Sequence, residues 1–231
     1  MNRMFKIIIN LSYLLSVLSV FIGGNLFPQT QTGVGEGVQN RKEFVKLQES
    51  AQVKILLKYA STDNFMKENL YGEFNTCYLH KEAFEKFQKA VELLKESKTG
   101  RKFILFDCLR PRSIQYKLWE KVKGNAKEPY VANPEKGSIH NFGFALDLSL
   151  LEEDGKELDM GTSFDDFSQL SEPDLEEEFY KKGKLSPSQF ANRKFLRNIL
   201  LQAGFEQRPN EWWHFDALSS KIVKKRYKMI E

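Results

Sequence analysis

Cysteine and histidine are scarce in this chain: its 231 residues include two cysteines and three histidines. Cys77 and Cys108 are too few for a disulfide framework or for a four-cysteine zinc site. A single structural bridge and two separate buried thiols are both compatible with the sequence. Because histidine is rare, any site that needs two imidazoles must draw on His80, His140 and His214.

A dense basic stripe is also absent, although the formal net charge is +4. The nearest candidate, KIVKKR at 221–226, is typical of a solvated C-terminal tail. Nucleic-acid binding needs concentrated positive charge, so we expect no nucleic-acid partner. With 41% hydrophobic and 29% charged residues and no internal repeat, the composition indicates a globular domain rather than a disordered or fibrous chain.

Charge is missing altogether from residues 7–27, which follow the basic lead MNRMFK. Such a lead before an apolar stretch is typical of a secretory signal, and the stretch is also long enough for an uncleaved membrane anchor. We therefore expect a signal peptide or anchor over 1–27 that engages the membrane, a polar linker over 28–45 and an exported domain over 46–231. The domain would lie in the periplasm or outside the cell, and the sequence sets no oligomeric state.

Hydrophobic periodicity predicts helices mixed with short strands. We expect helices at 80–100, 110–124 and 186–205, and a short helix leading into an extended segment within 43–65. Extended segments or strands are expected at 71–79, 102–109, 137–150 and 210–217, with a hairpin turn at 152–159 and an irregular loop at 160–186. This order favours a single α+β domain with a central, mostly antiparallel sheet flanked by helices.

The strand predicted at 137–150 has two different faces. Phe142 and Phe144 belong to a bulky apolar face, whereas Asp147 stands among small residues on the other. A buried carboxylate is unfavourable without a partner, and small neighbours leave room for a metal or ligand. His140 can turn in beside Asp147 if Gly143 permits a bend. The alternative is an aspartate bound to a loop, with His140 on the surface.

The segment EWWHF at 211–215 supplies another histidine and a glutamate. On a strand Glu211 and His214 would face opposite sides, so both reach one site only if Glu211 lies in the turn before it. Two histidines and one carboxylate suit a catalytic zinc ion with one open position. Glu211 would then be the general base. His80 opens a predicted helix and is expected to be a surface or capping residue.

Arg110 follows the predicted strand at 102–109 and precedes a proline. A guanidinium at a strand end can point into a cleft, where its fixed donors suit an oxyanion or carboxylate. A salt bridge to Asp107 or to an acidic loop is the alternative.

These segments resemble a known family. SIHNFGFALD is similar to the S-x-H-x-x-G-x-A-x-D motif, and EWWH to the E-x-x-H motif, of zinc D-Ala-D-Ala dipeptidases. KYASTDNF, DCLRP, MGTSFDDF and NRKFLRNILLQAGF resemble dipeptidase segments in the same order. The resemblance runs from about residue 50 to 218, and it implies a hedgehog/D,D-peptidase-like fold.

The resemblance implies one zinc ion per chain, bound by His140, Asp147 and His214. It implies Glu211 as the catalytic base and Arg110 as the group that stabilises the oxyanion.

Ser138 and Asp165 match positions near the bound dipeptide. Asp165, or Asp166 beside it, would hold the substrate ammonium. The implied reaction is hydrolysis of D-Ala-D-Ala to two D-Ala. The alternatives are a related murein D,D-carboxypeptidase or endopeptidase, and a zinc-binding module that does not cleave. Phe142 and Phe144 are bulkier than the motif leads one to expect, so we expect them to affect the pocket shape.

Overall fold

A computed structural model describes residues 36–231. The signal peptide or anchor predicted at 1–27 lies outside these residues. The last part of the predicted linker does not: helix α1 (Glu36–Gln39) and strand β1 (Phe44–Lys46) lie there, and Val38 is buried. Folded structure therefore begins before residue 46. No helix of the described residues combines the length and apolar character needed to cross a membrane.

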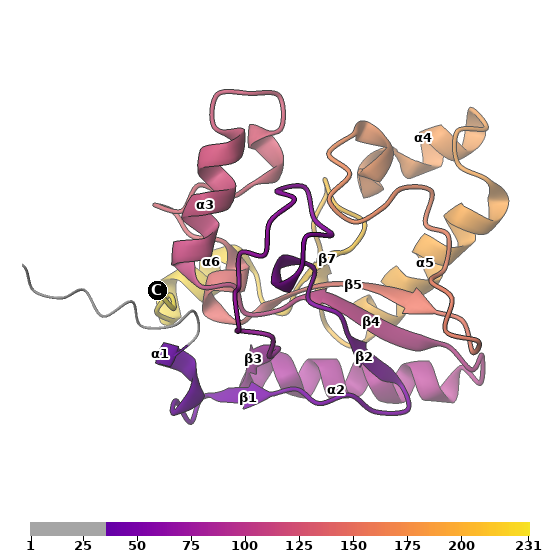
Figure 1. The fold of residues 1–231 in the computed structure, drawn as a ribbon. Coiled ribbons are helices and arrows are strands. Elements are labelled where there is room, and N and C mark those ends of the chain that lie inside the picture. The colour runs from indigo at the N-terminus through magenta and orange to yellow at the C-terminus, as the bar shows by residue number, and fades with distance from the viewer. Residues whose placement is uncertain (1–35) are drawn as a thin grey trace, which may run out of the picture. The chain divides into compact units, whose positions relative to one another are not determined.

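A five-stranded sheet forms the centre of the fold (Figure 1). Its order is β2 (Val53–Ile55), β4 (Lys102–Asp107), β5 (Ala145–Leu151), β7 (His214–Asp216) and β6 (Glu206–Gln207). β2 and β4 are parallel, and the other neighbours are antiparallel. The predicted α+β architecture with a mostly antiparallel sheet is confirmed.

A second, two-stranded sheet pairs β1 with β3 (Tyr78–His80). The helix predicted near the start of 43–65 is therefore wrong. A short segment gains little from an isolated helical turn, because helix nucleation is unfavourable. Pairing with β3, where Phe44 lies opposite His80, gives its backbone hydrogen bonds instead.

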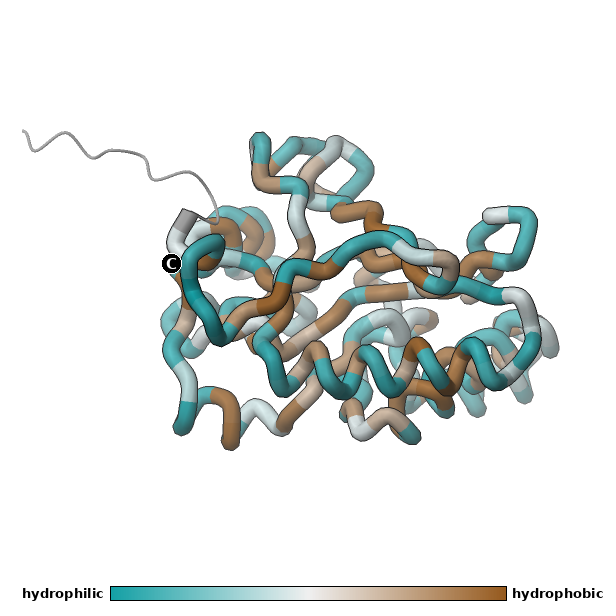
Figure 2. The backbone as a smooth tube through the Cα atoms, turned by 90° about the horizontal axis from the view of Figure 1, so that it is seen from below, coloured by the Kyte–Doolittle hydropathy of each residue, from teal (hydrophilic) through white to brown (hydrophobic). Residues whose placement is uncertain are grey.

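Two long helices pack against the central sheet and against each other: α2 (Lys81–Glu96) and α5 (Pro187–Gln202). α2 buries Ala83, Phe87, Ala90 and Leu94, a stripe at helical spacing along one face. Seen from below, hydrophilic and hydrophobic residues alternate along its turns (Figure 2). The predicted capping role of His80 is confirmed, because its side chain accepts a hydrogen bond from the Glu82 backbone N–H at 3.3 Å.

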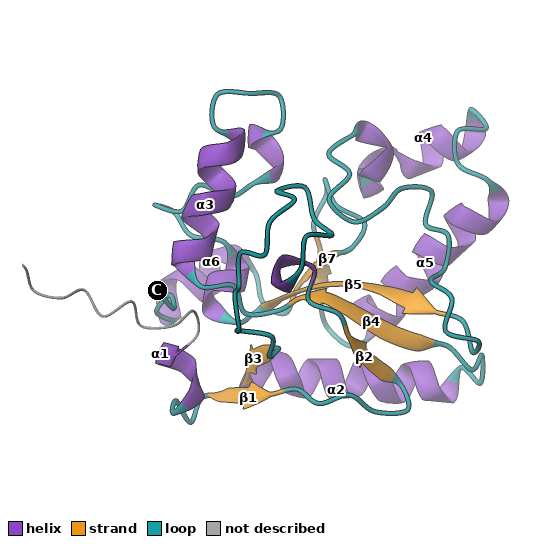
Figure 3. Ribbon diagram, in the orientation of Figure 1, coloured by secondary structure: helices purple, strands orange, loops and turns teal. Residues whose placement is uncertain are grey.

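Shorter helices and loops surround the sheet on the side opposite α2 (Figure 3). The region predicted as an irregular loop at 160–186 also contains a short helix at Glu176–Lys181. The remaining elements are α3 (Arg112–Val122), α4 (Glu176–Lys181), α6 (Ser220–Arg226), and the 3-10 turns η1 (Lys58–Ala60), η2 (Glu128–Tyr130), η3 (Ile139–Phe142), η4 (Gln169–Ser171) and η5 (Pro173–Leu175).

The strand predicted at 137–150 is shorter than expected. Its first part is the turn η3, and Gly143 follows it in the left-handed conformation with φ of 72°. A side chain there would also come within 2.7 Å of the Phe44 ring, so both conformation and space call for glycine. This bend separates His140 from the strand that carries Asp147.

A disulfide joins Cys77 to Cys108, which settles the two alternatives that the sequence left open. The bridge links the segment before β3 to the residue after β4. It therefore ties the smaller sheet to the strand end from which Arg110 emerges.

Candidate metal centre and active site

His140 is oriented by a backbone carbonyl. Its Nδ1 lies 2.6 Å from the carbonyl oxygen of Cys108. A carbonyl can only accept, so Nδ1 carries the proton and donates. In the neutral imidazole the other ring nitrogen, Nε2, then carries a lone pair. This Nε2 lies 3.2 Å from Oδ2 of Asp147.

His214 is oriented in the same way by a carboxylate. It lies opposite Asp147 in the register between β5 and β7. Its Nε2 donates to Oδ1 of Asp216 at 2.8 Å, which leaves the lone pair on Nδ1. That Nδ1 lies 3.0 Å from Oδ1 of Asp147 and 3.2 Å from Nε2 of His140.

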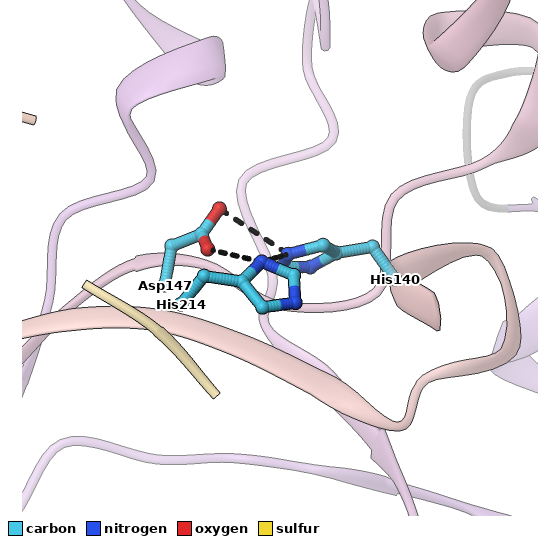
Figure 4. Close-up of side chains that lie close together, drawn as sticks. All are labelled: His140, Asp147 and His214. Atoms are coloured by element: carbon cyan, nitrogen blue, oxygen red, sulfur yellow. Dashed lines mark hydrogen bonds and ion pairs between the residues drawn. The ribbon is translucent and has the colours of Figure 1, made fainter. Parts of the chain in front are cut away.

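When both imidazoles are neutral, three acceptor atoms therefore face one another in this cluster, an arrangement that calls for a cation between them. The side chains of His140, Asp147 and His214 point toward one another (Figure 4), and one ligand atom from each lies within 4.8 Å of the others. All three residues are buried, and Oδ1 of Asp147 has no hydrogen-bond donor. Two imidazoles and a carboxylate with converging lone pairs form a donor set that fits a divalent metal ion.

The electrostatics of the cluster also favour a cation. Burial alone lowers the pKa of His214, but the carboxylates of Asp216 and Asp147 outweigh it and raise this pKa to about 10. Burial likewise raises the pKa of Asp147, yet the two histidines hold it well below its usual range. Positive charge is thus strongly attracted to the point between the three side chains.

Glu211 lies in the turn before β7, as a shared site requires. Its Oε2 is 3.6 Å from Nδ1 of His214. Burial, reinforced by the negative charge of Asp147, raises the pKa of Glu211 to about 7 against the opposing effect of His214. A carboxylate that titrates near neutral pH is suited to accept and return a proton.

Arg110 is held by two polar side chains, and a third contact reaches the group of candidate ligands His140, Asp147 and His214 (the metal cluster). Its Nε donates to Oδ2 of Asp107 at 2.7 Å and its Nη1 to Oε1 of Gln115 at 3.0 Å. Its Nη2 lies 3.3 Å from Oδ2 of Asp147. The salt bridge to Asp107 considered as an alternative is present, and it positions the guanidinium at the cavity instead of withdrawing it.

One cavity holds the metal cluster, Arg110 and Glu211, and both predicted substrate residues line it. Ser138 begins the turn η3. Asp165 has the rare φ of 62° for a non-glycine residue, and it accepts hydrogen bonds from the Tyr59 hydroxyl at 3.0 Å and the Phe65 N–H at 3.3 Å. Burial raises the pKa of Asp165 to about 8.

The neighbouring aspartate has a different role. Asp166 accepts a hydrogen bond from the Ser168 backbone N–H at 2.9 Å and does not line the cavity. Of the two aspartates, Asp165 is the one that lines the cavity.

Phe142 and Phe144, expected to affect the pocket shape, are core residues. Both are buried, neither lines the cavity, and the Phe144 ring stacks on His80 at 4.4 Å between centroids.

Sequence reasoning missed several supporting residues. Tyr59 was seen only as part of a segment, although its ring lies under Arg110 at 5.0 Å. Tyr71 donates to Asp107 at 2.6 Å. Arg193 is buried and donates to the carbonyls of Met160 at 2.6 Å and Leu170 at 2.8 Å. The sequence offered no signal for Arg193, because the burial of an arginine on a predicted helix cannot be read from spacing alone.

An α+β domain with a metal-ligand triad, a carboxylate of raised pKa and a fixed arginine in one cavity has the parts of a metal-dependent hydrolase. Comparison with known proteins identifies the class: the chain belongs to the D-Ala-D-Ala dipeptidase family of M15 peptidases, whose model matches residues 40–230.

Two curated relatives are D-alanyl-D-alanine dipeptidases. The one from Escherichia coli is 33% identical over 165 residues, which cover 71% of this chain and 78% of the relative. The one from Enterococcus faecium is 33% identical over 175 residues, which cover 68% of this chain and 82% of the relative. Among solved structures, the LdcB LD-carboxypeptidase matches with a TM-score of 0.42 and 16% identity, over 82% of this chain and 75% of that chain. The family match and the two curated relatives make the chain a peptidase of the dipeptidase family.

Proposed function

We propose that this protein is a zinc-dependent dipeptidase that hydrolyses D-Ala-D-Ala to two D-Ala, with one zinc ion per chain. The observation that carries the proposal is the convergence of three potential metal-ligand atoms beside Glu211 and Arg110 in one cavity.

The donor set favours zinc among common metal ions. Two imidazole nitrogens and one carboxylate oxygen are usual ligands of catalytic zinc, whereas magnesium and calcium prefer oxygen alone. Cys108 and Asp216 would orient the two imidazoles from behind, as outer partners do in such sites. When bound, zinc supplies a Lewis acid that polarises a carbonyl and lowers the pKa of water.

Glu211 performs the proton transfers. Its carboxylate takes a proton from the attacking water and later gives it to the leaving amine. A pKa near neutrality makes both transfers accessible.

Arg110 stabilises the negative charge that develops on the carbonyl oxygen. Asp107 and Gln115 already fix its guanidinium, so little reorganisation is needed during the reaction.

Asp165 and Tyr59 hold the free ammonium of the substrate. They are hydrogen-bonded to each other and line the same cavity as the metal ligands. Ionised Asp165 is favoured by a bound ammonium, because the positive charge offsets the cost of burial. A free amino terminus is thereby preferred, which distinguishes a dipeptidase from a D,D-carboxypeptidase acting on acylated peptides.

The test is release of D-Ala from D-Ala-D-Ala by purified zinc-loaded protein. We expect turnover of the free dipeptide and little of its N-acetylated form. The reverse preference would replace the dipeptidase by the carboxypeptidase reading, and no turnover of either would overturn both.

Glu211→Gln tests the base. It should reduce kcat by about 10²–10⁴-fold with zinc still bound. Glu206→Gln, an exposed change on β6, is the matched control and should be neutral.

The wild-type kcat/KM should fall about tenfold per pH unit on the acid side, because the base works only when deprotonated. A bound cation places that fall below pH 7. A flat profile from pH 4 to 7 would contradict this role.

We further propose that the domain is exported. The basic lead and the apolar stretch 7–27 support this, and so does the Cys77–Cys108 bridge, since such bridges persist in oxidising compartments. Cell fractionation together with the mass of the mature protein tests it. An intact chain in the cytoplasm would overturn it.

A further inference from the structure

Two cations line the cavity in addition to Arg110. Arg208 lies between β6 and β7, and Lys224 lies on α6. Both side chains are exposed, and neither forms an ion pair with any carboxylate in residues 36–231. Arg110, the third cation of the lining, is paired with Asp107 and Asp147, whereas Arg208 and Lys224 have no such partner in the described residues.

The backbone fixes Arg208 next to the metal cluster. Its N–H donates to the carbonyl oxygen of His214 at 3.2 Å, which places the residue one hydrogen bond from a metal ligand. Lys224 comes from α6, which packs against the turn η3 that carries His140. Arg208 is therefore anchored beside His214, and the helix that carries Lys224 packs against the turn that carries His140.

The surroundings of Lys224 are short of negative charge. Burial lowers its pKa, and the positive charges of Arg208 and Lys136 lower it further. Asp216 acts in the opposite direction, but its Oδ1 already accepts the hydrogen bond from His214. An anion between Arg208 and Lys224 would relieve this repulsion.

Asp165 lies in a different charge environment from Lys224. The charged groups that act on Asp165 are Asp147 and Arg110, whereas those that act on Lys224 are Arg208, Asp216 and Lys136. A cavity with a carboxylate in one part and two unpaired cations in another matches a zwitterion, which has an ammonium at one end and a carboxylate at the other.

We propose that Arg208 and Lys224 form the subsite for the C-terminal carboxylate of the dipeptide, so that the enzyme selects peptides with a free carboxylate. The inference rests on the proposed function. It makes both residues determinants of specificity, outside the set that carries out the chemistry.

The experiment compares D-Ala-D-Ala with D-Ala-D-alaninamide in the zinc-loaded wild type, R208Q, K224Q and the double variant. Each single variant should lose about tenfold in kcat/KM on the acid, mainly through KM, and little on the amide. The acid-to-amide preference should collapse in the double variant. K225Q removes a neighbouring exposed charge on the same helix that does not line the cavity, and it should leave the preference unchanged.

A preserved preference in the double variant would overturn the subsite. Arg208 also lowers the pKa of Glu211, so R208Q could shift the pH profile. Such a shift would act on acid and amide alike and would leave their ratio unchanged, which separates it from lost carboxylate binding.

Failure of the proposed function has a different signature. If the wild type cleaves neither peptide, calorimetric titration of both peptides into the same proteins tests the subsite directly. Tighter binding of the acid by wild type than by the double variant, with equal binding of the amide, would sustain it. Equal binding of the acid by both proteins would overturn it.

Discussion

The metal cluster and the loop that carries Asp165 line the same cavity, yet they are held in different ways. Asp147 and His214 are opposite partners on β5 and β7, so sheet register fixes their backbones. The Asp165 loop (residues 160–171) has no such ladder. It is held by side chains: Arg193 donates to the carbonyls of Met160 and Leu170, and Trp212 Nε1 donates to Thr162 Oγ1 at 2.8 Å.

This difference separates the two tasks of the site. Two of the three proposed metal ligands, Asp147 and His214, lie on fully buried strands, whereas the part proposed to recognise the substrate depends on a few side-chain contacts. Substitutions of the metal ligands should abolish metal binding. Substitutions in the Asp165 loop or its supports should weaken substrate binding while the metal stays bound.

Removing a metal ligand should have the largest effect. In His214→Ala the imidazole lone pair is lost, and we expect loss of bound zinc and a fall in kcat/KM of about 10³-fold or more. Metal content by mass spectrometry, measured beside activity, checks this. His80→Ala is the matched control, because His80 caps α2 and lies outside the cluster, so zinc should be retained. A zinc-replete His214→Ala protein would show that the cluster is not the metal site.

Neutralising the aspartate of the loop should have an intermediate effect. Asp165→Asn removes the charge that faces the ammonium, so kcat/KM for D-Ala-D-Ala should fall about 10–100-fold, mostly in KM. Zinc content should not change. Asp166→Asn alters the adjacent residue, which does not line the cavity, and should be close to neutral. Equal losses in the two variants would contradict the assignment of the ammonium to Asp165.

Loosening the support of the loop should have the smallest effect on turnover. Arg193→Lys keeps the charge but loses the planar fork that reaches two carbonyls, so unfolding free energy should drop by about 1–3 kcal/mol. KM should rise a few-fold with zinc retained, as denaturant unfolding and steady-state kinetics would show. Arg197→Lys, one turn further along α5 and paired with Glu176, controls for charge on that helix. A loss of zinc in Arg193→Lys would erase the contrast between the two regions.

The same contrast explains how much could be predicted from the sequence. His140, Asp147, Glu211 and His214 stand in two short motifs, and the helices at α2, α3 and α5 have regular spacing and end signals. Their placement could therefore be predicted. β1 could not, because its conformation depends on pairing with β3, which is more than thirty residues away.

Supporting contacts were equally hidden. The link from Arg193 to Met160 joins residues 33 positions apart, and that from Tyr71 to Asp107 joins residues 36 positions apart. No local pattern encodes such pairs. The same holds for Arg208 and Lys224. In the sequence both are ordinary surface charges, and only the fold brings the β6–β7 connection and α6 to one cavity.

β5 is buried at every one of its seven positions. A lineage under selection for a new substrate has little room to vary there, because each change would disturb packing on one face or the metal ligand on the other. Changes in specificity are expected instead in the Asp165 loop, at Arg208 and along α6, where more positions are exposed. A mutant library confined to these positions would sample new preferences while leaving the hydrolytic centre in place.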